Sequence, residues 1–87
     1  MAAGTYTLHV LGQTDVNRGK LDWYLDAEVS PQITGQDWYS GSSVYGVEKT
    51  GSITIPTDGI HTLTAIVNGT NISSGDYFIA LVMMWLD

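Results

Sequence analysis

The sequence contains no cysteine, so neither disulfide bonds nor a thiolate metal site can stabilise it. Basic residues are almost as scarce: Arg18, Lys20 and Lys49 stand against nine carboxylates, and the formal net charge is −6. A chain of that charge repels the phosphates of nucleic acids and of anionic lipids, so we expect neither nucleic acid nor a membrane as a partner. Its 87 residues allow a single domain, residues 1–87, with a modest core of its own.

Helical periodicity is also missing. Apolar residues recur at every second position, as in half-buried strands, and no stretch carries the 3.6-residue stripe of a helix. The alternation is clearest at residues 5–10, 21–26 and 61–67, and further strands are expected near 37–39, 44–48 and 51–55. Between them lie turn formers, such as those of residues 56–59. The sequence therefore predicts an all-β, antiparallel sandwich.

Two parts of the chain are similar to each other. Gly4–Leu8 matches Gly59–Leu63, and Thr14–Gly19 matches Thr70–Gly75 after one inserted residue. Both parts read strand, polar turn, strand, so we predict two similar hairpins at about residues 5–26 and 60–86. Unrelated hairpins also share threonine, glycine and alternating apolar residues, so the match is either a duplication or an analogy.

Long apolar runs are absent except at residues 77–86, which carry no charge. Ten residues are too few to cross a bilayer as a helix, which needs about 20, so we expect a strand that protein covers on both faces. Alignment with the first hairpin predicts that one row faces the domain's core: Tyr77, Ile79, Leu81, Met83 and Trp85. The other row is predicted to contact partner subunits in a homo-oligomer, for which we expect a trimer: Phe78, Ala80, Val82, Met84 and Leu86.

Aromatic residues gather in the loop-rich middle of the chain. Rings offer flat apolar faces to sugars, and nearby carboxylates can accept hydrogen bonds from hydroxyl groups. The predicted glycan site consists of Trp38, Tyr39, Tyr45, Asp37 and Tyr24. The alternative is structural: Trp38 would plug one end of the sandwich, or Tyr39 would pack against a neighbouring subunit.

Residues suited to catalysis are few. Asp22 and Asp26 share a strand face, but at 3.3 Å per residue they lie about 13 Å apart, beyond the roughly 5–9.5 Å of a glycosidase pair. His9 and His61 are the only imidazoles, and neither lies in a metal-ligand spacing. We therefore expect no enzyme, no cofactor and no metal. A Ser-His-Asp site assembled across the fold is one alternative, and Ca²⁺ bound by turn oxygens is another: Asp15, Asn17, Asp58, Asn71 and Asp76.

Four stretches resemble, in order, strands of the jelly-roll carbohydrate-binding modules: Gly4–Val10, Gly19–Asp26, Ser52–Pro56 and Gly59–Leu63. With its apolar last strand, the chain is also similar to small oligomeric domains of phage tail fibres and spikes and to capsid decoration proteins. The resemblance implies a jelly-roll sandwich that binds without chemistry, in a virion or outside the cell. The partners it implies are a capsid or fibre protein or a glycan. The alternative is a free-standing module that binds a polysaccharide.

Overall fold

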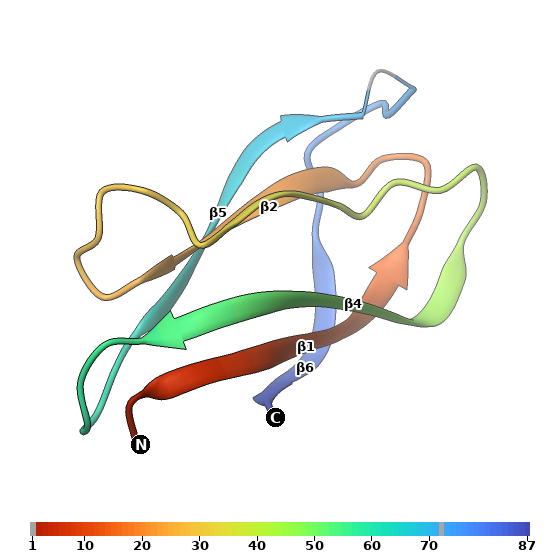
Figure 1. The fold of residues 1–87 in the computed structure, drawn as a ribbon. Coiled ribbons are helices and arrows are strands. Elements are labelled where there is room, and N and C mark those ends of the chain that lie inside the picture. Colours follow the sequence, from red (N-terminus) through yellow and green to blue (C-terminus); the bar gives the residue numbers. More distant parts are fainter. Residues whose placement is uncertain (1, 72) are drawn as a thin grey trace.

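The computed structural model describes residues 2–71 and 73–87, which form six strands and no helix (Figure 1). The strands are β1 (Gly4–Thr14), β2 (Gly19–Leu25), β3 (Ile33–Asp37), β4 (Val44–Ile55), β5 (Leu63–Thr70) and β6 (Ala80–Leu86). They build two antiparallel sheets of three strands, in the orders β4-β1-β6 and β3-β2-β5. The predicted all-β sandwich is confirmed. Nowhere in the described ranges is there a helix long and apolar enough to span a membrane.

The core lies between the two sheets and consists mainly of alternate residues of β1, β2 and β4. Eight apolar side chains are buried among the described residues: Leu8, Val10, Leu21, Trp23, Leu25, Trp38, Ile53 and Ile55. Two of these side chains are indoles, and Gln36 satisfies the N–H group of each. Its Oε1 accepts hydrogen bonds from Nε1 of Trp23 and Nε1 of Trp38, both at 3.0 Å. A buried indole N–H needs such a partner, so one amide supports the two largest side chains of the core.

Strands that follow each other in sequence mostly lie in different sheets. β1 pairs with β4 and β6, and β2 pairs with β3 and β5, so the predicted hairpins at residues 5–26 and 60–86 are wrong. The alternation of apolar residues identified most of the strands, although β3 lies at 33–37 instead of 37–39 and the strands predicted at 44–48 and 51–55 form the single strand β4. Alternation carries no information about which strand pairs with which. Met1, and Ile72 within the matched segment Thr70–Gly75, lie outside the described residues.

Three connections cross between the sheets at one end of the sandwich, after β1, after β3 and after β5 (Figure 1). Backbone hydrogen bonds join them: Asp15 N donates to Trp38 O, Gly75 N to Val16 O, and Phe78 N to Asn17 O. The strand ends that carry these connections are therefore held together. At the opposite end lie the chain termini and the connection from β4 to β5.

Candidate association edge

β6 is an outer strand of its sheet. One side pairs with β1, and no strand of the described residues lies on the other side. Thr7 and Asp87 exchange both of their backbone hydrogen bonds, at 3.1 and 2.9 Å. Because backbone groups alternate in direction along an antiparallel strand, the N–H groups of Met84 and Leu86 point away from β1. β6 therefore presents backbone donors and acceptors at the edge of the sheet.

An irregularity in the pairing divides β6 into two parts. Leu11 pairs with Met83, but Gly12 pairs with Leu81, so Val82 is an extra residue in β6. A Cβ atom on Gly12 would lie 2.6 Å from Ala80 O, so this close approach of the two strands requires glycine. Since successive residues of a strand point to opposite faces, one extra residue reverses which residues face the core.

The side chains follow a different pattern on each side of this bulge. Ile79 and Leu81, before the bulge, pack against the core as predicted. After the bulge, Leu86 packs against the core, and Met84 lies beside buried Val10 on the same face. The prediction that Leu86 belongs to the partner-facing row is therefore wrong.

Three residues predicted to face the core are exposed instead. Met83 and Trp85 lie on the outer face of the sheet, beside Leu11 and His9. Tyr77 precedes the strand and is also exposed. The prediction was wrong because both the odd and the even positions of residues 77–86 are apolar. The pattern alone therefore does not show that the core-facing row changes from one set to the other within the strand. Gly12 inside an otherwise alternating strand is the signal that could have revealed the bulge.

The exposed apolar surface of β6 lies around the bulge. Val82 is 72 % exposed, and the exposed fractions of Met83, Met84 and Trp85 lie between 37 and 53 %. Of the other residues in the predicted partner-facing row, Phe78 is exposed and Ala80 is half-buried. Single exposed apolar residues are common on protein surfaces, but a contiguous group of this kind marks an interaction site.

His9 lies on the outer face of the same sheet and contacts residues of β4 and β6. Its ring stacks on Trp85, with centroids 4.9 Å apart and planes within 1°. Its Nδ1 lies 3.1 Å from Glu48 Oε2, and its Nε2 lies 3.6 Å from Asp87 Oδ2. The imidazole therefore links β4, β1 and the end of β6, and it covers one face of the indole.

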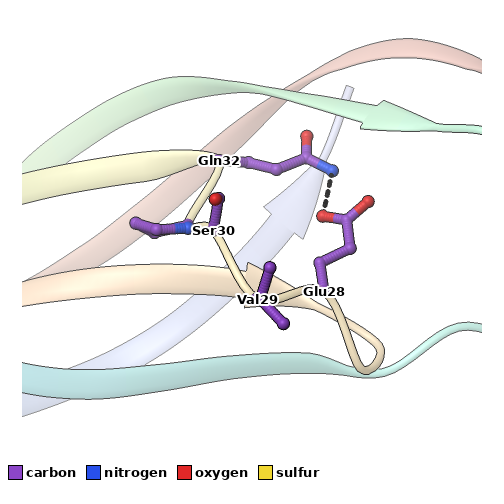
Figure 2. A pocket seen from close by; sticks show the side chains of 5 residues that line it. Glu28, Val29, Ser30 and Gln32 are labelled. Carbon is purple, nitrogen blue, oxygen red and sulfur yellow. Dashed lines mark hydrogen bonds between the residues drawn. The ribbon is translucent and has the colours of Figure 1, made fainter.

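The opposite edge of this sheet, β4, is closed by a side chain. Gln32 Oε1 accepts a hydrogen bond from Thr54 N at 2.6 Å, and Gln32 Nε2 donates to Thr54 O at 3.0 Å. Gln32 Nε2 also donates to Glu28 Oε1, as Figure 2 shows. The amide thus occupies the place of a neighbouring strand. Lys49 and the positive φ of Gly46 (69°) disfavour strand pairing further along β4.

Two hollows accompany the loops near Gln32. The loop from Glu28 to Gln32 borders an open hollow of about 570 Å³ (Figure 2). A second hollow of about 290 Å³ lies between the sheets at the end where the termini meet, lined by Leu25, Ile55, Gly59, Ile60, His61, Leu63 and Leu86. The residues that line the second hollow are almost all apolar, whereas the first hollow is lined by a single surface loop with polar residues.

The predicted glycan site loses its central ring. Trp38 is fully buried and hydrogen-bonded to Gln36, so the prediction that it presents a ring face to a ligand is wrong, and the structural alternative describes its position. Asp37, at the end of β3, accepts hydrogen bonds from Tyr39 N at 3.0 Å and from Asn71 Nδ2 at 2.9 Å. It thereby joins two of the connections between the sheets.

The three tyrosines of the predicted site lie on separate elements. Tyr39 is half-buried after β3, where it forms a β-bridge with Asp15. Tyr24 is half-buried on β2, and Tyr45 is 78 % exposed at the start of β4. Tyr45 therefore offers the most accessible ring of the five residues.

His61 holds the connection from β4 to β5. Its Nδ1 lies 2.6 Å from Asp26 Oδ2, and its Nε2 lies 2.6 Å from Thr57 O. Both partners are acceptors, so the ring satisfies both only when both nitrogens carry protons. Accordingly, the hydrogen bonds to Asp26 and then to Thr57 raise the pKa of His61, and the His61 bond lowers the pKa of Asp26.

The turn oxygens considered for Ca²⁺ hold the turns themselves. Asp15 accepts hydrogen bonds from Ser43 Oγ at 2.6 Å and from Val16 N at 2.7 Å, and these bonds lower its pKa. Asp58 likewise accepts a bond from Ala3 N at 2.7 Å. Within residues 2–71 and 73–87, no three His, Asp or Glu side chains are placed together so that they could hold a metal ion.

No protein-family model, curated protein sequence or solved structure matches this chain. Its most unusual part is the edge strand β6, which is uncharged, apolar and open.

Proposed function

We propose that this protein is a non-catalytic structural module that forms a homo-oligomer through its C-terminal strand, β6. The observation that carries the proposal is the open edge of residues 80–86, where four consecutive apolar residues are exposed beside outward-pointing backbone groups. An exposed apolar edge strand is a template for pairing with another chain.

Association through this edge would add stability that a small domain lacks. Complete burial of a large apolar side chain is worth roughly 1.5–3 kcal/mol, and a whole domain has a stability of about 5–15 kcal/mol. Val82, Met83 and Met84 are about half exposed or more, so covering them recovers a substantial fraction of such a stability. The same surface left in water favours unspecific aggregation.

Within this proposal, the larger assembly is of the phage or virion type, such as a fibre tip or a capsid decoration protein. The supporting features are the small all-β sandwich, the absence of cysteine and the apolar last strand. The expected additional partner is then a capsid or fibre protein, and the place of action is a virion.

Measurement of the mass in solution tests this proposal. Sedimentation equilibrium of the purified chain at micromolar concentration should give a multiple of its 9.4 kDa. The variant Val82→Asp should sediment as a monomer, because strand pairing would bury its unpaired charge. A wild-type protein that stays monomeric at every concentration would contradict the proposal.

Glycan recognition is the second candidate, favoured by Tyr45, whose ring is 78 % exposed. A glycan array probed with the wild type and with Tyr45→Ala tests it. Binding that disappears in the variant would support this candidate, as part of the module or as a free-standing carbohydrate-binding module. Binding that is absent, or is unchanged by the substitution, would remove Tyr45 from the argument.

A further inference from the structure

We infer that two copies of this chain associate by antiparallel pairing of β6 with β6 of the second copy. The product is a two-fold dimer in which three strands from each copy form one continuous sheet. This inference rests on the proposed function, and it specifies the partner and the geometry. Three observations carry it: the direction of the backbone groups, the state of the other edges and the position of the charge.

The backbone of β6 is self-complementary. Met84 and Leu86 point both their N–H and their C=O groups away from β1, as the hydrogen-bonded pair of Thr7 and Asp87 requires. A second β6 that runs in the opposite direction presents the same alternating groups in the matching order. A two-fold axis then brings each donor opposite an acceptor.

The other three edges of the sandwich are poor partners for β6. β4 is capped at Thr54 by the Gln32 amide. β3 has only five residues and contains Gly35 at φ 61°, and β5 contains Gly69 at φ 90° near its end. Positive φ values interrupt the extended backbone that strand pairing needs. Among the described edges, β6 has the longest run of exposed apolar residues, at positions 82–85, so the best partner for β6 is another β6.

The charge at the chain end favours the antiparallel orientation. β6 has no charged residue, and Asp87 follows it directly. Parallel pairing would place the two Asp87 carboxylates roughly 5 Å apart, whereas antiparallel pairing with Met84 opposite Leu86 of the second copy separates them by about 13 Å along the strands. Each copy already carries a net charge of −6, so the two copies repel each other. The antiparallel orientation adds less repulsion to this than the parallel one, because it keeps the two Asp87 carboxylates farther apart.

A pair of proline variants tests the backbone pairing. Met84→Pro removes an outward N–H of β6 without removing a hydrogen bond to β1, and it should halve the mass measured by sedimentation. Thr50→Pro is the matched control, because Thr50 shares the outward direction of Thr54 on the capped edge. It should leave the mass unchanged. Met84→Ala keeps the N–H and should remain a dimer, which separates the backbone effect from the loss of the side chain.

Cysteine cross-linking tests the orientation even if a proline variant does not fold. The chain has no cysteine, so one introduced at any of positions 82–86 is its only thiol. Antiparallel strands bring only one position opposite its own copy, so one variant of the five, with at most a neighbouring position, should form a cross-linked dimer on oxidation. Efficient cross-linking at all five positions would indicate parallel strands and overturn the inference, and so would its failure at every position.

The outcomes separate this inference from the proposed function. A monomeric wild type contradicts both. An oligomer that Val82→Asp dissociates but Met84→Pro does not would retain the module and overturn the backbone pairing. A trimer mass would retain the oligomer expected from the sequence and overturn the two-fold dimer.

Discussion

The two edges of one sheet, β4 and β6, are built in opposite ways. β4 carries Lys49, bends at Gly46 and has its end capped by the amide of Gln32. β6 carries no charge and no cap among the described residues, and it exposes Val82. Both strands pair antiparallel with β1, so their inner edges meet the same requirement for backbone hydrogen bonds. The difference therefore concerns the outside of the sheet: one edge is protected against another chain, and the other edge is not.

The largest effect is expected from a charge on the core side of β6. Leu86 packs against the core, so Leu86→Asp should destabilise the subunit by about 3 kcal/mol through an unpaired carboxylate. For a domain of this size that lowers the melting temperature by roughly 12–24 °C. Thermal denaturation followed by circular dichroism measures it. A variant that melts like the wild type would show that residue 86 does not support the core.

A charge on the exposed bulge should act on association instead. Val82→Lys gives β6 the kind of side chain that Lys49 provides on β4. Because Val82 is 72 % exposed in the subunit, the variant subunit should keep its fold. The dissociation constant of the oligomer should rise about 100-fold, which corresponds to about 2.7 kcal/mol. Sedimentation at several concentrations checks this, and an unchanged constant would place the interface elsewhere.

Removal of the cap should make β4 more like β6. Gln32→Ala deprives Thr54 of both side-chain hydrogen bonds and should cost about 1–3 kcal/mol of stability. The uncapped edge should also associate further at high concentration, which light scattering would detect. Glu28→Ala is the control, because it leaves the two bonds to Thr54 in place. If both variants behave alike, the amide does not protect the edge.

The smallest effect concerns the connection that leaves β4. The pKa of His61 is raised above 6.5 by Asp26, so the stability that this bond adds is complete below pH 6.5 and is lost as the pH rises through the raised value. The pKa of Asp26 is lowered below 3.8, so its contribution is lost only as the pH falls through that lower value. The melting temperature should therefore decrease slightly as the pH rises above 6.5, and His61→Gln should flatten that slope. The mass should stay constant, since the two hydrogen bonds of His61 join Asp26 and Thr57, neither of which belongs to β6.

The sequence predicted most of the strands because their alternation depends on local burial. Trp23 alternates with its neighbours and lies in the core, as its pattern indicates. Asp22 lies on the outer face of β2, yet it is buried. Its carboxylate accepts bonds from Gly35 N and Asn68 Nδ2, at 2.9 and 2.7 Å, and so joins three strands. Such bonds depend on strand order, which the local pattern does not contain.

Only part of the candidate site could be predicted from the sequence. A strand with apolar residues on both faces needs cover on both, and this reasoning directed attention to residues 77–86, which include the edge strand β6. The assignment of Met83 and Leu86 to their faces failed because it depended on one extra residue opposite Gly12. The cap by Gln32 had no sequence signal, since an amide can close an edge only where the fold brings it there.

The place of β1 between β4 and β6 requires pairing between residues that are far apart in the sequence. β1 begins at Gly4, whereas its two partners begin at Val44 and at Ala80. Contacts across such separations form slowly, because the entropy of closing the intervening chain is lost before the contacts are gained. Folding of this sheet is therefore expected to be slow, and the flank of β1 should stay unpaired until β6 docks.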